Sequence, residues 1–362
     1  MRPLAWLGLL RQGRFRIQPS RITYFLGVSL ATPWNTVLAG LQAVIFRSRL
    51  ANAELHGPPV FIIGHWRSGT TLLHELMVLD ERYSSPSTYQ CFAPNHFLVS
   101  EWFFQKFLRW LLPGKRPMDN MAAGWDRPQE DEFALMNLGL PSPYRHMAFP
   151  REEPVDLNYL DFQDVDEAAL KRWLKTLRSF LLGVSSVTGR PLVIKSPTHT
   201  GRIAALAKEF PDARFIHVTR DPCALFPSTC RLWFSLSDAQ GLQAPLKPTD
   251  AEDDDSELSA DKQYVINCLS RMYDSFLRDR ENIDPNRIVD IRYEDLIADP
   301  VAILENVYRS LRLSDFDSVR PVIEAWSNNE HRSYQTNRHQ LSQRDEATIR
   351  SAWKHYFETY GY

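Results

Sequence analysis

The chain has 362 residues, and its 42 basic and 44 acidic side chains nearly cancel. This balance gives no reason to expect a nucleic-acid partner, so any anion site must be built locally. The length suits one large α/β domain with additions, and the four cysteines have neither zinc-ligand spacing nor the density of a disulfide scaffold. A globular enzyme or binding protein is expected.

The first predicted element is an apolar stretch from Ile22 to Phe46, which runs 25 residues without a charged side chain. Its length permits a membrane span, although polar residues dilute it and Pro33 divides it in two. We favour a peripheral or re-entrant membrane element over a buried helical hairpin and over a true span. Residues 1–57 are therefore predicted to form an apolar, helical, membrane-associated segment. No Asn starts a glycosylation site, which favours a cytoplasmic, peripherally membrane-associated protein.

Strand and helix patterns alternate from residue 58 onward. Short apolar runs predict strands, and amphipathic stretches between them predict helices. The strands are expected within residues 58–66, 190–197, 213–222 and 286–296, and the helices within residues 71–79 and 200–210. This order predicts an α/β fold with a P-loop-like parallel sheet flanked by helices, whose ligands bind at the carboxyl ends of the strands.

Two stretches interrupt the alternation. Residues 80–190 form a long insertion rich in aromatic residues and proline, which we expect to wall an acceptor pocket. Residues 238–262 contain the acidic run AEDDDSEL and few apolar side chains, a composition that predicts a mobile loop. Both are expected to belong to one catalytic domain over residues 58–362.

The segment GHWRSGTT, residues 64–71, follows the first predicted strand and opens the first predicted helix. Gly64 and Gly69 let the backbone bend, so that successive N–H groups and the helix N-terminus face one point. That point suits an anion. The P-loop of nucleotide hydrolases carries Lys directly after its second Gly, whereas Thr70 stands there in this chain and the positive charge lies within the loop at Arg67.

A second anion site is indicated by Arg220 and Ser228. Arg220 ends a predicted strand, and Ser228 lies eight residues further on, beyond a turn at Asp221 and Pro222. A guanidinium fork and a hydroxyl can hold the same phosphate, although this motif alone is equally compatible with an ordinary ion-paired turn. Together, the two motifs predict a ligand with phosphates at both ends of a nucleoside.

These motifs resemble those of the sulfotransferases that use 3′-phosphoadenosine 5′-phosphosulfate (PAPS) as donor. In that family, a strand-loop-helix with Lys or Arg before Ser-Gly-Thr-Thr holds the 5′-phosphosulfate, and an Arg and a Ser eight residues apart hold the 3′-phosphate. The likeness covers residues 58–362, includes RYEDLIADP at 292–300, and is greatest to a broad bacterial-type branch. It implies PAPS as co-substrate, no required metal, and donor contacts by Arg67, Ser68, Gly69, Thr70, Thr71, Arg220 and Ser228.

A polar segment near the C-terminal end, NEHRSYQTNRHQLS, resembles the family's loop that closes over the adenosine end of the donor. The likeness adds Tyr334, Asn337 and Arg338 to the expected donor-binding residues. A solvated linker before the last amphipathic helix is the alternative.

The expected chemistry explains why side chains suffice without a metal. Sulfuryl transfer proceeds in line, and negative charge accumulates on the bridging and leaving phosphate oxygens as the S–O bond breaks. Positioning and fixed positive charge then supply most of the catalysis. We expect Arg67 and Lys195, each following a predicted strand, to supply that charge.

The general base is harder to find, because other branches of the family place a His or Glu where this chain has neither. His74 lies two turns into its helix and is expected to be packed or on the surface. The remaining candidates are Glu130, His199 and Glu132, and we favour Glu130 because branches with Arg in the loop tend to use Glu.

The acidic cluster around Glu130 also has a purely structural explanation. Asp126 would cap a helix with Pro128 in its first turn, where carboxylates favour the helix dipole.

The sequence thus predicts transfer of a sulfuryl group from PAPS to a hydroxyl of a small-molecule or lipid acceptor, with a membrane surface as a further partner. A P-loop kinase or NTPase would keep the anion loop but needs Mg²⁺ and the missing Lys. A non-catalytic nucleotide-binding module would keep both anion sites without a base.

Overall fold

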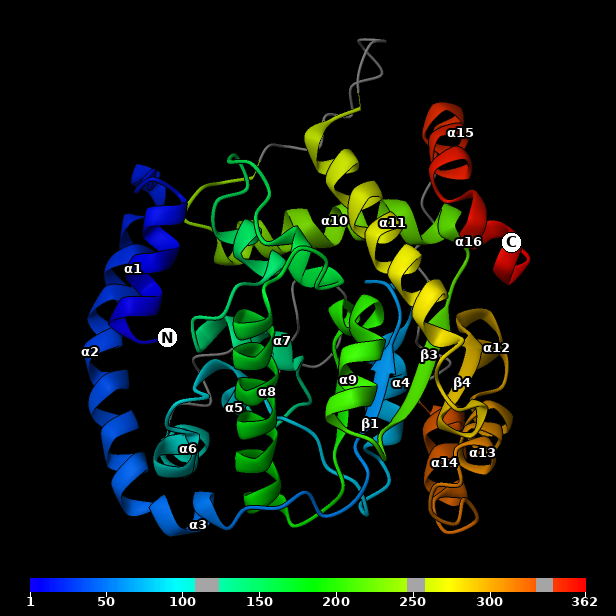
Figure 1. The fold of residues 1–362 in the computed structure, drawn as a ribbon, viewed down its shortest axis with the longest axis horizontal. Coiled ribbons are helices and arrows are strands. Elements are labelled where there is room, and N and C mark those ends of the chain that lie inside the picture. The colour runs from blue at the N-terminus through cyan, green and yellow to red at the C-terminus, as the bar shows by residue number, and fades with distance from the viewer. Residues whose placement is uncertain (108–123, 246–257, 330–340) are drawn as a thin grey trace. The chain divides into compact units, whose positions relative to one another are not determined.

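The computed structural model describes residues 1–107, 124–245, 258–329 and 341–362 (Figure 1). The chain folds into two compact units, each assembled from segments that are distant in the sequence. Unit 1 comprises Met1–Leu55, Pro86–Gly189 and Arg231–Ser259, and unit 2 comprises His56–Ser85, Arg190–Cys230 and Ala260–Tyr362. Most of the predicted insertion therefore belongs to unit 1, while the single catalytic domain over residues 58–362 stays a prediction.

Unit 2 is built on a four-stranded parallel sheet with the strand order β2-β1-β3-β4. Val60 of β1 pairs with Val193 of β2 and with Arg214 of β3, and Phe215 of β3 pairs with Ile288 of β4. The strands are β1 (Val60–Ile63), β2 (Val193–Lys195), β3 (Arg214–Thr219) and β4 (Ile288–Arg292). Each lies within one of the four predicted runs, so the predicted α/β fold with a parallel sheet is confirmed.

Helices cover both faces of this sheet, because the side chains of parallel buried strands are apolar on both sides. On one face, Val60 and Ile62 share a core with α4 and α13. On the other face, Phe61 packs against Phe210 and Phe215. The helices of unit 2 are α4 (Thr70–Met77), η5 (Pro197–Arg202), α9 (Ile203–Glu209), α11 (Ala260–Arg280), η6 (Pro285–Arg287), α12 (Tyr293–Ala298), α13 (Pro300–Ser310), α14 (Arg320–Asn329), α15 (Gln343–Ala352) and α16 (Lys354–Tyr360).

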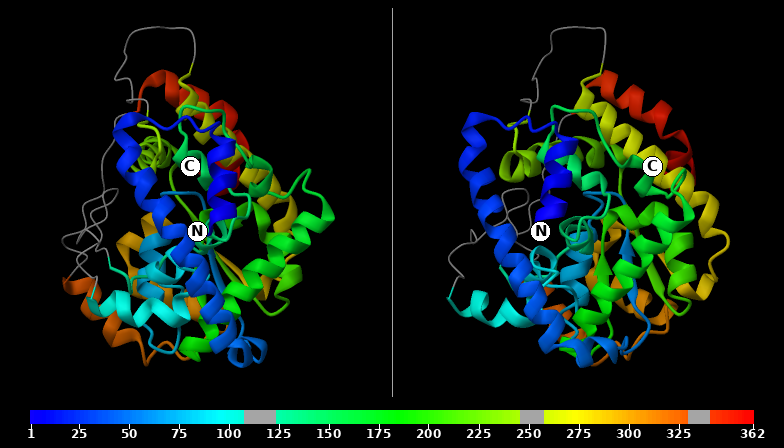
Figure 2. Two further views of the ribbon diagram at one scale, coloured as in Figure 1. Left: turned by 90° about the vertical axis from the view of Figure 1, so that its left-hand side faces the viewer. Right: turned by 60° about the vertical axis from the view of Figure 1, so that its left-hand side comes forward.

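Unit 1 is built from helices, of which α2 and α8 are the longest in its described part. Figure 2 shows α1 and α2 beside one another and α6, in cyan, next to α2. The helices are α1 (Pro3–Gln12), η1 (Pro19–Arg21), α2 (Ile22–Ile45), α3 (Arg47–Ala51), α5 (Thr88–Phe92), α6 (Phe97–Phe107), α7 (Asp131–Asn137), η3 (Pro143–Ala148), η4 (Leu157–Leu160) and α8 (Glu167–Thr188). Helix α10 (Pro222–Gln240) starts in unit 2 and ends in unit 1.

The N-terminal apolar stretch forms one continuous helix, α2, so the expected division at Pro33 is wrong and the alternative of a helical hairpin within this stretch is excluded. Pro33 lacks the N–H that would bond to the carbonyl of Ser29 four residues earlier. The hydroxyl of Thr32 donates to that carbonyl instead, at 3.1 Å, and supplies a partner for the carbonyl that the proline leaves without one. By length and composition, residues 19–45 could cross a membrane, and little of this segment is buried within the protein.

Candidate active site

The loop between β1 and α4, residues 64–69, closes tightly on itself at the carboxyl end of the sheet. Gly64 has φ +141°, and a Cβ atom there would lie 2.5 Å from the carbonyl oxygen of Val218 and 2.7 Å from Oγ of Ser68, so only glycine fits. The N–H of Gly64 donates to the hydroxyl of Thr200 at 2.8 Å. The loop is therefore anchored to β3 and to η5, which follows β2.

Gly69 occupies the second bend and is the N-cap residue of α4, with φ +99°. A Cβ atom at this position would lie 2.3 Å from the ring of Tyr293, the first residue after β4. The same ring carries the guanidinium group of Arg220, which lies 4.3 Å from the ring centroid in a cation–π contact. Tyr293 thus touches both predicted anion-binding elements.

These two elements meet at Arg67. Nε of Arg67 donates to Oγ of Ser228 at 2.9 Å, and the backbone carbonyl of Arg67 accepts a bond from Nη1 of Arg220 at 2.6 Å. Arg67 holds this position with a left-handed backbone at φ +68°, which is unusual for a residue with a side chain. The structure therefore brings together three residues that the sequence analysis placed in two separate motifs.

Basic side chains follow three neighbouring strands at the same edge of the sheet. Lys195 is the last residue of β2 and is almost fully buried. Arg220 follows the last residue of β3 and is also buried, while Arg67 lies in the loop after β1. Because the carboxyl ends of parallel strands share one edge, this edge of unit 2 carries concentrated positive charge.

Two buried polar atoms of the loop have no hydrogen-bond partner within the described part of the chain. They are Oγ of Ser68 and Nε2 of His65. A buried hydroxyl without a partner is costly, so Ser68 fits a loop whose donors are completed by a bound anion. His65 is different: its Nδ1 donates to the carbonyl of Trp66 at 3.0 Å, which leaves Nε2 as an acceptor. Burial lowers the pKa of His65 to about 3, so the ring is neutral at physiological pH.

Two of the histidines considered as bases lie in the interior of unit 2. Nε2 of His74 is 3.3 Å from the carbonyl oxygen of Val193, and the side chain is buried, so of the two expected alternatives His74 is packed and not on the surface. His199 is fully buried with its ring edge-on to Phe61, and its Nδ1 lies 3.3 Å from the guanidinium group of Arg202. That environment holds the imidazole firmly inside the fold.

The acidic cluster lies in unit 1, at the start of α7. Glu130 is the N-cap residue of this helix and is partly exposed, and its carboxylate accepts a bond from the hydroxyl of Tyr144. Glu132 is fully buried and accepts a bond from the hydroxyl of Ser142. The proposed capping by Asp126 is wrong, because the helix starts at Asp131, too late for Asp126 to reach its first N–H groups.

The sequence analysis assigned no separate role to Tyr293 of unit 2 or to Glu101 of unit 1. Tyr293 entered the sequence analysis only as part of the segment RYEDL. Its position directly after a predicted strand also indicates a place at the carboxyl end of the sheet, beside the loop. The carboxylate of Glu101 in α6 accepts bonds from two residues at the start of α5, Ser87 at 2.9 Å and Gln90 at 3.1 Å. Burial raises the pKa of Glu101. No sequence signal places Glu101 there, since the contact depends on how α5 and α6 pack.

Three of the predicted donor contacts, Tyr334, Asn337 and Arg338, lie outside the described residues. Thr70 and Thr71 form the first turn of α4, as expected from their place in the motif.

Comparison with known proteins gives consistent matches over most of the chain. A family model described as "Sulfotransferase family" matches residues 58–318. The chain is also 38% identical over 358 residues to the omega-hydroxy-beta-dihydromenaquinone-9 sulfotransferase Stf3 of Mycobacterium bovis, in an alignment that covers 99% of this chain and 89% of the relative.

Solved structures show the same fold at lower identity. The sulfotransferase STF9 from Mycobacterium avium matches with a TM-score of 0.70 at 20% identity, over 95% of this chain and 86% of that chain. The sulfotransferase STF1 from Mycobacterium tuberculosis H37Rv matches with a TM-score of 0.61 at 19% identity, over 88% of this chain and 85% of that chain.

Proposed function

Because the chain belongs to the sulfotransferase family and is an enzyme of that class, we propose that it transfers a sulfuryl group from PAPS to a hydroxyl group of a lipidic acceptor. The observation that carries the donor assignment is the meeting of the two predicted anion motifs at Arg67, which accepts a bond from Arg220 and donates one to Ser228. A nucleotide with phosphates at both ends suits two such adjacent elements.

In this proposal, the loop after β1 binds the 5′-phosphosulfate and the Arg220–Ser228 pair binds the 3′-phosphate. The partnerless hydroxyl of Ser68 supports the first assignment. Gly69, Thr70 and Thr71 contribute the backbone N–H groups and hydroxyls at the start of α4, where the helix dipole favours an anion. The cation–π contact with Tyr293 supports the second assignment, because it helps to hold the Arg220 guanidinium group in place.

Transfer breaks the S–O bond to the 5′-phosphate and forms a new S–O bond to the acceptor oxygen, while the acceptor proton passes to a base. The electron pair of the broken bond stays on the bridging oxygen, which becomes a phosphate oxygen of the product nucleotide. Arg67 and Lys195 stabilise that developing charge, and the burial of Lys195 strengthens its effect because little solvent screens it. No metal ion is required for this step.

Glu130 is the base in our proposal, ahead of His199 and Glu132. Its partial exposure supports this order, since a base must reach a substrate proton. Glu132 and His199 are fully buried, and each has a hydrogen-bonding neighbour inside the fold. Tyr144 holds the Glu130 carboxylate through a charge-assisted bond.

The acceptor is proposed from the relative Stf3, whose name gives a hydroxylated menaquinone as its substrate. Identity of 38% over nearly the whole chain supports an acceptor of the same broad class, a hydroxylated apolar lipid. Such acceptors reside in membranes, which supports a peripheral location at a membrane surface.

Isothermal calorimetry tests the donor assignment. We expect 3′,5′-adenosine bisphosphate to bind without metal, AMP to bind much more weakly, and ATP to gain nothing specific from Mg²⁺. Arg220→Ala should lower bisphosphate affinity roughly 30- to 150-fold, equivalent to about 2–3 kcal/mol for a charge-assisted pair, and leave AMP affinity nearly unchanged. Arg309→Ala, an exposed arginine of the same unit, is the matched control.

The acceptor assignment needs a transfer assay with radiolabelled PAPS and detergent-dispersed hydroxylated lipids. Label should appear in the organic extract with an omega-hydroxylated menaquinone and with a long-chain primary alcohol. Transfer of label only to water-soluble alcohols would refute the lipid acceptor.

For the donor test by calorimetry, equal binding of AMP and the bisphosphate would refute the 3′-phosphate site.

A further inference from the structure

The long helix α2 of unit 1 exposes a stripe of apolar side chains. Its large apolar side chains recur every three to four residues and are exposed; they are Ile22, Leu26, Leu30, Trp34, Val37, Leu41, Val44 and Ile45. Leu30, Trp34 and Val44 are 72%, 69% and 78% exposed. A surface helix of a water-soluble protein would turn this stripe inward.

Four polar side chains of α2, Ser29, Thr32, Asn35 and Gln42, make contacts within the protein. Ser29 accepts a bond from the indole N–H of Trp6 in α1 at 2.9 Å, and Thr32 is buried. Asn35 donates to the carbonyl of Met1 at 2.9 Å. Gln42 is buried and accepts from the backbone N–H of Leu98 in α6 at 2.8 Å. Hydrogen bonds therefore fasten the inner face of α2 along most of its length.

Helix α6 lies beside α2 in the same unit (Figure 2). Three of its aromatic side chains, Trp102, Phe103 and Phe107, are exposed, and Trp102 is 63% exposed. The ammonium group of Lys106 lies 5.5 Å from the ring centroid of Phe107. Exposed tryptophans flanked by cations are typical of side chains at the boundary between lipid headgroups and acyl chains.

The N-terminal part of this surface is rich in arginine, and two of these arginines are ion-paired, Arg16 with Glu152 and Arg21 with Asp238. Residues 1–53 contain seven arginines and no Asp or Glu. Arg14 precedes α2 and Arg47 follows it, and both are exposed, while no charged residue interrupts the helix itself. A basic border around an apolar face is complementary to a bilayer with anionic headgroups, whereas the same border on a second copy of the chain would be repelled.

We propose that the exposed stripe of α2, together with Trp102, Phe103 and Phe107 of α6, is a docking surface that lies flat on an anionic phospholipid bilayer. A flat orientation follows from the inner-face hydrogen bonds, which a membrane-spanning α2 would have to break. Lying flat, this helix of about 36 Å offers an extended apolar footprint to the bilayer. Only the purpose of this docking surface, delivery of a lipid acceptor to the enzyme, depends on the proposed function.

Vesicle flotation with the full-length protein tests this surface. We expect the protein to float with phosphatidylcholine vesicles that contain phosphatidylglycerol, and less with phosphatidylcholine alone. The triple variant Leu26→Gln, Leu30→Gln, Trp34→Gln should reduce the bound fraction by about tenfold or more, because it removes adjacent apolar contacts from one face. The double variant Val187→Gln, Val322→Gln changes exposed valines elsewhere and should float like the wild type.

Calorimetry with 3′,5′-adenosine bisphosphate and thermal melting, run on every variant, show that the fold and the donor site are intact. Should the triple variant prove unstable, the single change Leu30→Glu at a largely exposed position provides the same comparison. Undiminished flotation of a folded triple variant or of a folded Leu30→Glu variant refutes the proposed docking surface. So does a wild-type dimer that the triple variant converts to a monomer, or resistance of bound protein to alkaline carbonate, which indicates a span. Flotation without bisphosphate binding would instead refute the proposed function and leave the surface standing.

Discussion

Arg67 and Ser228 are 161 residues apart in the chain and are joined by a hydrogen bond of 2.9 Å from Nε to Oγ. Because the serine oxygen accepts this bond, its own proton remains available for another acceptor. The pair therefore presents a guanidinium group and a hydroxyl donor side by side. We infer that the loop and the proposed 3′-phosphate site act as one unit in which Arg67 is shared.

We expect Arg67→Ala to lower kcat by about 10² or more and to affect donor affinity less, because the charge that Arg67 offsets develops mainly during transfer. Arg67→Lys keeps the charge but loses the guanidinium group that reaches Ser228. Its kcat should therefore lie between those of the wild type and Arg67→Ala. Steady-state kinetics with radiolabelled PAPS give both parameters. Lys208→Ala removes an exposed cation of unit 2 and should be silent, and a change in KM alone for Arg67→Ala would exclude its catalytic role.

The proposed base is tested by three single substitutions. Glu130→Gln should lower kcat by about 10² or more while bisphosphate affinity holds, because the amide keeps the shape but cannot accept the proton. Glu132→Gln and His199→Ala change buried groups, so their main effect should be a lower Tm. Glu153→Gln, an exposed carboxylate in unit 1, is the control. An active Glu130→Gln enzyme beside an inactive but folded His199→Ala enzyme would transfer the role to His199.

Gly69 tests the packing of the loop against Tyr293. An Ala at this position adds a Cβ atom 2.3 Å from the Tyr293 ring and must also adopt φ +99°, so we expect a loss of about 2–4 kcal/mol in the free energy of unfolding. Gly189→Ala is the matched control, because Gly189 has φ +63° and open space around it; it should lose only about 1 kcal/mol. Equal melting temperatures for the two variants would show that the contact with Tyr293 is unimportant.

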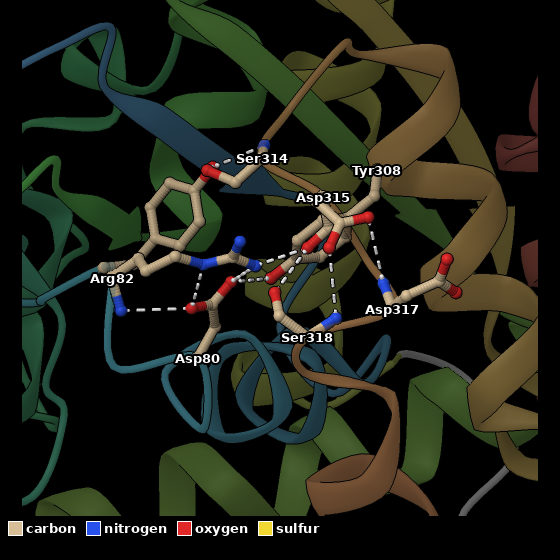
Figure 3. Close-up of polar contacts among 8 residues, drawn as sticks. Asp80, Arg82, Tyr308, Ser314, Asp315, Asp317 and Ser318 are labelled. Atoms are coloured by element: carbon tan, nitrogen blue, oxygen red, sulfur yellow. Dashed lines mark hydrogen bonds and ion pairs between the residues drawn. The ribbon is translucent and has the colours of Figure 1, made fainter.

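A polar cluster in unit 2 ties the end of α4 to the segment between α13 and α14 (Figure 3). Asp80 accepts two bonds from the Arg82 side chain, at 2.8 and 2.7 Å, and one from the hydroxyl of Tyr308 at 2.9 Å. Burial alone would raise the pKa of Asp80, but the bonds from Arg82 and Tyr308 outweigh it and hold the pKa below its ordinary value of 3.8. Arg82 also donates to the carbonyl of Asp315, which completes the tether.

Asp80→Asn should therefore lower the free energy of unfolding by about 2 kcal/mol at neutral pH, with the partial exposure of Arg82 limiting the loss. A depressed pKa in the folded state contributes stability above the unfolded value near 3.8, and this contribution is lost as the pH falls further. The Tm gap between wild type and variant should be constant from pH 5 to 8 and shrink below about pH 4. Glu81→Gln, at the exposed neighbouring position, should show no such gap at any pH.

Much of unit 2 could be predicted because its strands are short apolar runs with clear boundaries. β1 to β4 all lie within predicted runs, and the Gly-rich loop is where the motif placed it. The bond between Arg67 and Ser228 was not predictable, since it depends on α10 returning across the loop, where Thr229 donates to the carbonyl of Trp66. Periodicity predicts that a segment is helical, but it does not say which distant side chain arrives beside it.

Three features of the structure differ from the sequence predictions or were absent from them. Pro33 ordinarily interrupts a helix, but the hydroxyl of Thr32 bonds the carbonyl that the proline leaves without a partner. Asp126 and Pro128 resemble a helix start, yet α7 begins at Asp131. Glu101 reaches Ser87 only through tertiary packing, so no reading of residues 84–90 alone would have found a carboxylate there.

The strand order has a consequence for synthesis on the ribosome. β1 is synthesised before its two sheet neighbours. Val60 cannot pair until Val193 and Arg214 have been translated, more than a hundred residues later. Until then, the nascent chain displays β1 without its neighbours together with the outward-facing apolar residues of α2. Such long-range parallel pairing is slow to form and leaves an aggregation-prone apolar surface exposed in the meantime. Newly made chains are therefore expected to need a chaperone, or early contact with the bilayer, during the interval before β3 emerges.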